Sequence, residues 1–116
     1  MYRHQVLREL KYDGLKRFVE LQAEKNALLV AAGLTPYTVW APAFGGLYHM
    51  TLEATFPSLA AFEEERARAK ADPAIAKIEA AQLELVRDGT ASDRMQRLSL
   101  AAPTPAEGSE DGKGGG

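Results

Sequence analysis

The 116-residue sequence has no cysteine and no long apolar run, and these absences exclude several classes of protein. Without cysteine the chain has no disulfide framework, no thiolate nucleophile and no cysteine-based zinc site. Its longest apolar windows, such as residues 27–34, fall far short of the roughly 20 residues that a membrane span needs. Arg3, His4, Arg8 and Glu9 interrupt any signal-like start. We therefore expect a cytoplasmic protein that does not enter a membrane.

The sequence also lacks an excess of basic residues. Lysine and arginine number 14 and aspartate and glutamate 16, and the whole difference lies after Leu100. Residues 1–100 are formally neutral and carry no basic stripe. Nucleic acids and anionic membranes are bound through clustered lysine and arginine, so neither is an expected partner.

Large apolar side chains are missing from the end of the chain. Residues 101–116 hold two prolines and five of the ten glycines. Such a segment buries too little apolar area to offset its ordering entropy. We predict a folded domain over residues 1–100 and a disordered Pro/Gly-rich tail over residues 101–116, and the glycine run fits a natural or an added terminus equally well.

Residues 1–100 alternate between strand and helix patterns. Residues 2–10 have the period of a strand, although Arg8 interrupts its apolar parity. A broad apolar stripe predicts a helix over residues 14–32, with Asp13 as its cap and Gly33 as its stop. Four further elements follow in chain order: an edge strand over 37–41 between two prolines, a strictly alternating strand over 47–56, a helix opened by Pro57-Ser58 and restarted at Asp72-Pro73, and a short strand over about 93–100.

The resulting order is β-α-β-β-α-β, which predicts an α+β fold of the ferredoxin-like kind. In this fold two helices cover one face of a four-stranded antiparallel sheet, whose spatial strand order is 4-1-3-2. Apolar residues occupy more than one parity of the predicted strands, among them Val6, Tyr37, Trp40 and Leu98. We therefore expect the second sheet face to be covered by another copy of the chain in an isologous dimer.

The stretch VWAPAFGGLYHMTLEATFPSLAAFEEERARAKADPAI, residues 39–75, resembles NIPSNAP-like proteins of the dimeric α/β-barrel superfamily. It has a tryptophan near the end of the second strand, a glycine turn, an aromatic third strand, a Pro-Ser helix start and an Asp-Pro restart. The matching positions are Trp40, Gly45, Gly46, Phe56, Ser58, Phe62, Asp72 and Pro73. The resemblance, which extends over about residues 2–100, implies a homodimer whose two sheets form a barrel, with a ligand cavity between each sheet and its helices.

The resemblance leaves the function open between two classes. NIPSNAP-like proteins have no settled catalytic residues to transfer, whereas the superfamily includes cofactor-free monooxygenases and other natural-product tailoring enzymes. One hypothesis is a small dimeric protein that binds a hydrophobic or aromatic molecule or acts as an accessory. The alternative is a cofactor-independent monooxygenase or related tailoring enzyme. No cofactor is expected under either.

The two histidines are the candidate catalytic residues. His49 lies on the polar parity of its strand, where it would act as a general base or substrate partner, pair across a dimer interface, or simply stand half exposed. Glu53 shares that parity but lies about 13 Å along the strand, too far for a direct pair. His4 falls on the neighbouring strand, and a suitable register would bring the two histidines together near Glu53 or Arg8. Their spacing matches no metal signature, so no metal site is expected.

The aromatic residues around the second hairpin are the candidate ligand-binding residues. Tyr37, Trp40, Phe44 and Tyr48 would stack on a flat ligand, with Glu53 nearby, or would pack in a dimer interface. An enzyme should place His49, His4 or Trp40 in a pocket with convergent polar groups. The acidic run at residues 63–65 is expected to form a solvated helix face.

Overall fold

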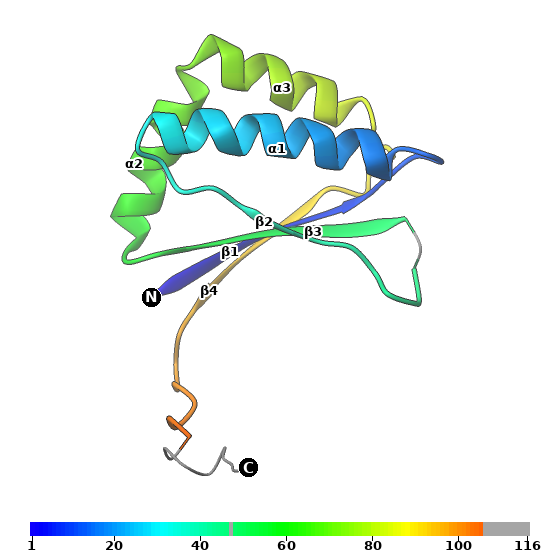
Figure 1. Ribbon diagram of the computed structural model, residues 1–116. Helices are drawn as coiled ribbons and strands as arrows, with labels where there is room; N and C mark the ends of the chain where they lie inside the picture. The colour runs from blue at the N-terminus through cyan, green and yellow to red at the C-terminus, as the bar shows by residue number, and fades with distance from the viewer. Residues whose placement is uncertain (47, 106–116) are drawn as a thin grey trace.

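The computed structural model describes residues 1–46 and 48–105, and in it three helices cover one face of a four-stranded sheet (Figure 1). The elements in chain order are β1 (Tyr2–Glu9), α1 (Leu15–Ala31), β2 (Thr38–Trp40), β3 (His49–Phe56), α2 (Leu59–Lys70), α3 (Pro73–Leu83) and β4 (Ser92–Arg97). The predicted order is therefore confirmed, with the second helix divided into α2 and α3. Residues 101–105 are exposed and irregular. The remainder of the predicted tail, 106–116, lies outside the described residues.

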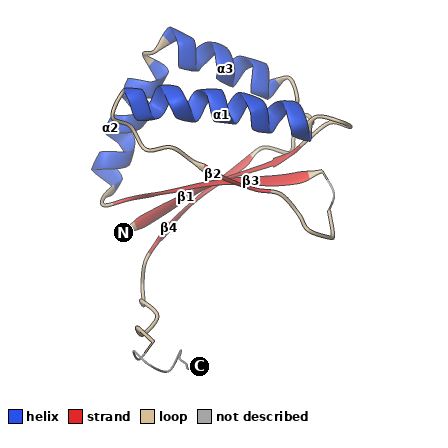
Figure 2. Cartoon of the chain, in the orientation of Figure 1, coloured by secondary structure: helices blue, strands red, loops and turns tan. Residues whose placement is uncertain are grey.

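The sheet is antiparallel throughout and has the strand order β2-β3-β1-β4 (Figure 2). This is the predicted order 4-1-3-2 read from the other edge. The register places Val6 opposite Leu52 on one side and opposite Asp93 on the other. Strand β2 pairs only through Thr38–Trp40 and forms an edge, as its flanking prolines predicted.

The two faces of the sheet differ in polarity. Because cross-strand partners share a face, Met50, Leu52 and Val6 all point toward the helices, on the face here called inner. The expectation of apolar residues spread over both faces is only partly correct. Two of the residues named for it, Val6 and Tyr37, pack on the inner side together with the core. The opposite, outer face is mainly polar. Its apolar residues are Trp40 and Leu7, which the register places in one row with Thr51 between them, and Met1 and Leu98, which lie at the other end of β1.

The helix caps follow the sequence in two cases of three. Ser58 accepts a hydrogen bond from the Ala61 amide, and Asp72 accepts from the Ala74 and Ile75 amides, as expected for N-caps. The predicted Asp13 cap is wrong, because Asp13 has a positive φ of 60° and Gly14 occupies the cap without a side-chain hydrogen bond.

Helices α1 and α3 run side by side in opposite directions above the sheet (Figure 1). A hydrogen bond of 3.0 Å from buried Gln82 to buried Gln22 joins them. Two apolar clusters form the core. One consists of Leu10, Phe18, Met50, Leu52 and Val86 and the other of Leu29, Leu34, Ala69 and Ile75. None of the helices in the described parts of the chain is both long and apolar enough to traverse a bilayer.

Candidate functional site

A cavity of about 270 Å³ lies between the inner face of the sheet and the helices. Val6, Leu52 and Phe56 line it from the sheet, and Phe18, Leu29 and Val86 add apolar side chains from α1 and from the segment after α3. Polar and charged side chains also enter it, including His4, Tyr37 and Asp93. A concave space in which apolar side chains and polar groups converge is the usual form of a small-molecule site.

His4 is the best-positioned titratable group of the cavity. It is 5% exposed, and its two ring nitrogens lie 2.7 Å from the Tyr37 hydroxyl (Nδ1) and 3.1 Å from Asp93 Oδ2 (Nε2). The edge of its ring contacts Phe62 at a centroid distance of 4.8 Å. The imidazole is therefore fixed on three sides, by a phenol, a carboxylate and an aromatic ring.

Asp93 reaches both His4 and Arg8 because of the sheet register. It stands opposite Val6, midway between these two residues on the inner face of β1. Arg8 Nη1 donates to Asp93 Oδ1 at 2.8 Å, and to the backbone carbonyls of Leu7 and Ser92. Partial burial opposes ionisation, but the hydrogen bonds from Arg8 and His4 outweigh it and hold the pKa of Asp93 below its ordinary value.

The ionised state of Asp93 decides the tautomer of neutral His4. A carboxylate has no proton to give, so His4 Nε2 carries the hydrogen and donates it to Asp93. Nδ1 is then an acceptor, and the Tyr37 hydroxyl donates to it. The three side chains thus form a directed chain of hydrogen bonds from Tyr37 through His4 to Asp93.

The lowered pKa of Asp93 predicts a pH-dependent contribution to stability. This contribution is present above the ordinary aspartate pKa and is lost as the pH falls through the lower pKa of the folded state. Asp93→Asn resembles the protonated carboxyl, so we expect the variant to be less stable than the native protein at neutral pH and equally stable in acid. Urea unfolding of both proteins across this range measures the difference. A constant difference at every pH would contradict the assignment.

Asn26 on α1 fixes the backbone of Tyr37. Its amide donates to the Tyr37 carbonyl at 2.8 Å, and its carbonyl oxygen accepts from the Tyr37 amide at 3.0 Å and from Gln22. Burial raises the pKa of Tyr37 well above that of a free tyrosine. The hydroxyl is therefore held protonated at a defined position on the cavity wall.

A second set of polar side chains lines the cavity near the helices. Lys25 Nζ lies 3.3 Å from Glu79 Oε2, and Arg66 Nη1 lies 3.8 Å from the same oxygen. Burial lowers the pKa of Lys25, although the neighbouring Glu79 carboxylate partly opposes this shift. Glu65 accepts hydrogen bonds from the amide and hydroxyl of Thr35 at 2.8 and 3.1 Å. The expected solvated face at 63–65 is therefore wrong for Glu65, which turns toward the cavity.

The formal charges around the cavity balance. Its cationic side chains are Arg8, Lys25 and Arg66, and its carboxylates are Glu65, Glu79 and Asp93. Each cation lies within ion-pair distance of a carboxylate. A charged ligand would add an unpaired charge to this balanced, partly buried set, so the electrostatics favour an uncharged one.

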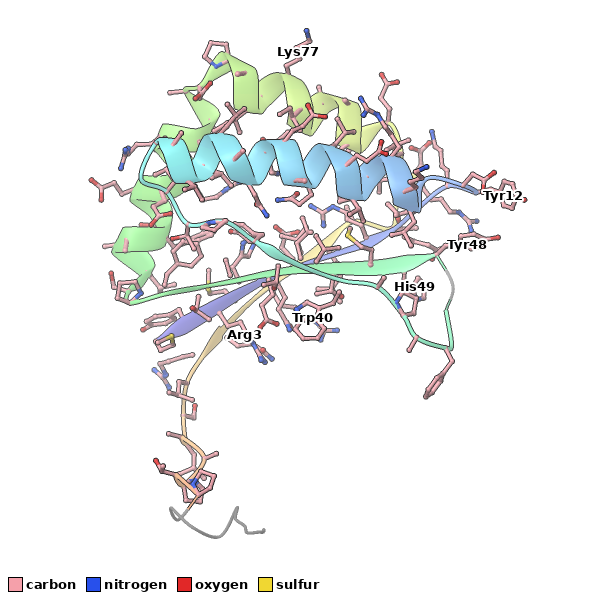
Figure 3. All side chains as sticks on the ribbon, viewed as in Figure 1. Arg3, Tyr12, Trp40, Tyr48, His49 and Lys77 are labelled. Atoms are coloured by element: carbon pink, nitrogen blue, oxygen red, sulfur yellow. The ribbon has the colours of Figure 1, made fainter. Side chains whose placement is uncertain are left out.

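The other candidate residues from the sequence lie away from this cavity (Figure 3). Trp40 and His49 project from the outer side of the sheet, and Glu53 shares that face, where Gln5 donates to it. Trp40 is 61% exposed and its indole donates to Thr38 Oγ1. Tyr48 packs at the end of the sheet against Tyr12. The predicted aromatic cluster is therefore split, with Tyr37 alone in the cavity.

The register does not bring the two histidines together. The register pairs His49 with Glu9 and His4 with Ala54, so the histidines stand on opposite faces. His49 Nε2 lies 3.1 Å from Glu9 Oε2, and its side chain is 66% exposed. Of the two candidate bases, only His4 has the enclosed, hydrogen-bonded environment of a functional imidazole.

Sequence reasoning missed Asp93 and gave Arg8 and Asn26 no defined place in this site. Arg8 and Asp93 are polar residues at inner-face positions, and Asn26 lies on the sheet-facing side of α1. A signal for Arg8 was present, because it breaks the apolar alternation of its strand. A charged residue on a buried parity indicates a partner, and here that partner is Asp93.

Comparison with known proteins places the chain in a family. The NIPSNAP family model matches residues 8–100. A NIPSNAP family protein of unknown function from Agrobacterium tumefaciens has 17% identity and a TM-score of 0.74, over 89% of this chain and 92% of that chain. An uncharacterized NIPSNAP domain protein from Burkholderia xenovorans has 10% identity and a TM-score of 0.73, over 90% and 100% of the two chains.

The same fold occurs outside the family. An antibiotic biosynthesis monooxygenase has 13% identity and a TM-score of 0.65, over 89% of this chain and 100% of that chain. No curated protein matches the chain. Likeness at these identities establishes the ferredoxin-like fold alone and transfers no chemistry. The family model, in contrast, covers most of the sequence, and the chain therefore belongs to the NIPSNAP family.

Proposed function

We propose that this protein binds a small, uncharged, partly aromatic molecule in the cavity between its sheet and its helices. The observation that carries the proposal is the convergence of Tyr37, His4 and Asp93 on a cavity of about 270 Å³ that apolar side chains also line. This volume is at the small end of the range for ligand pockets, which favours a compound of one or two rings. The balanced charges favour a neutral one.

Calorimetric titration with 2-naphthol, a neutral two-ring phenol, tests the proposal. We expect saturable binding that weakens about two- to tenfold in Tyr37→Phe, because one hydrogen-bonding group is lost while the ring shape is kept. Trp40→Phe is the matched aromatic control on the outer face and should bind as the native protein does. Absence of saturable binding, or an equal loss in both variants, would contradict a site in this cavity.

A second candidate function is a cofactor-independent oxygenase. The observation in its favour is the Tyr37–His4–Asp93 chain, since this chemistry begins with removal of a substrate proton by a protein base. The solved monooxygenase with the same fold supports it by analogy. Oxygen consumption with reduced polycyclic phenols tests it. Consumption that depends on His4 is expected, and none beyond the uncatalysed rate would remove this candidate.

We also propose that two copies of the chain associate through the outer face of the sheet, as a cytoplasmic homodimer. The row of Trp40, Thr51 and Leu7 supports this, because it presents apolar area on a face that no helix of the described chain covers (Figure 3). Arg3 and Glu53 lie on one side of the row and form an ion pair of 3.9 Å, so both signs of charge are present on this face, which suits a two-fold, self-complementary contact. A cytoplasmic location is consistent with a core that needs no disulfide.

A further inference from the structure

The cavity offers a bound ligand a route to His4 through Tyr37. Both nitrogens of His4 are occupied, Nε2 by Asp93 and Nδ1 by the Tyr37 hydroxyl. Tyr37 lines the cavity and uses its hydrogen on His4, so its oxygen retains lone pairs that accept a hydrogen bond. The preferred neighbour of that oxygen is therefore a donor, such as the hydroxyl of a ligand.

We propose that Tyr37, His4 and Asp93 form a proton relay that takes the proton from the hydroxyl of a bound neutral phenol or enol. This inference rests on the proposed function, since it requires a ligand in the cavity. The ligand is then a phenol or an enol, and each of the three residues has its own role in the proton transfer.

The relay consists of two coupled proton transfers, in which atoms and charge balance. The O–H bond of the ligand breaks, and its proton forms a new O–H bond on Tyr37 Oη as the proton of Tyr37 moves to His4 Nδ1. The ligand becomes an oxyanion and His4 an imidazolium. Asp93 stays ionised and stabilises the imidazolium through its contact with Nε2. No oxidant or reductant takes part.

Three features of the structure suit the relay to this task. Tyr37 is half-buried and its backbone is held by Asn26, so its oxygen stays at one position relative to the cavity. Because burial disfavours the tyrosinate, Tyr37 gives its proton to His4 only as it takes the ligand's proton, and it stays neutral throughout. Arg8 holds the second oxygen of Asp93 and keeps the carboxylate directed at the imidazole.

Binding of 4-nitrophenol measures the relay, because the phenolate of this compound absorbs visible light and the neutral phenol does not. We expect the native protein to bind it and to raise the ratio of phenolate to phenol about tenfold over that in solution, equal to about one unit in the pKa of the bound compound. The His4→Gln and Tyr37→Phe variants should bind it in the neutral form. His49→Gln, the matched change on the outer face, should behave as the native protein.

The readouts separate the two proposals. Calorimetry reports binding and absorbance reports ionisation, and circular dichroism verifies that each variant is folded. If His4→Gln does not fold, Tyr37→Phe decides the question, because it leaves the His4–Asp93 pair in place. Binding without ionisation, or equal ionisation in Tyr37→Phe, would overturn the relay and leave the binding site standing. Absence of binding would overturn both.

Discussion

Replacing Asn26 with alanine is expected to lower the free energy of unfolding by about 2–3 kcal/mol, because it leaves the amide and carbonyl of Tyr37 without partners. The same change should weaken 2-naphthol binding at least as much as Tyr37→Phe does, since the phenol is no longer held at its position. Urea unfolding followed by circular dichroism gives the first quantity and calorimetry the second.

Glu24→Ala is the matched control for this prediction. Glu24 lies on the same helix, is exposed and has only a long contact with Arg17, so its loss should change stability by less than about 0.5 kcal/mol. An Asn26→Ala protein as stable as this control would show that water replaces the side-chain amide. It would contradict the view that α1 positions the site through Asn26.

Substituting Trp40 with glutamate is expected to convert a dimer into a monomer of 12.6 kDa. The change places a carboxylate in the apolar row of the outer face, where a second copy would bury it without a partner. Sedimentation velocity at micromolar concentration measures the mass of both proteins.

Lys77→Glu controls for charge, because Lys77 projects from α3 on the far side of the helix layer (Figure 3). That variant should keep the mass of the dimer. A native protein that sediments as a monomer, or a Trp40→Glu protein that stays dimeric, would contradict association through this face.

Much of the fold followed from short-range signals in the sequence. The alternation in residues 49–56 and the Ser58 and Asp72 caps depend on local chemistry, and each is present in the structure. The strand order followed from the handedness of the crossovers. Asp13 failed as a cap because the chain after β1 turns through a positive φ there, in a segment that the hydrogen bond from the Lys11 amide to the distant Leu85 carbonyl holds.

The candidate site was harder to predict, because it depends on register. His4 and Tyr37 were named from residue type, but they lie 33 residues apart in the sequence. Asp93, which also contacts His4, lies 89 residues away from it. No local spacing contains these pairings. The same register separates His4 from His49 by placing them on opposite faces of adjacent strands, whereas sequence order alone suggested that they approach.

The most direct test of the account is a map of amide chemical shifts during titration with 2-naphthol. We expect the largest changes at Thr35, Tyr37 and Val86, which line the cavity, with little change at Thr51 on the outer face. Shifts that cluster around Thr51 and Trp40 instead would place the ligand on the outer face. That result would contradict the central claim that the cavity between the sheet and the helices is the functional site.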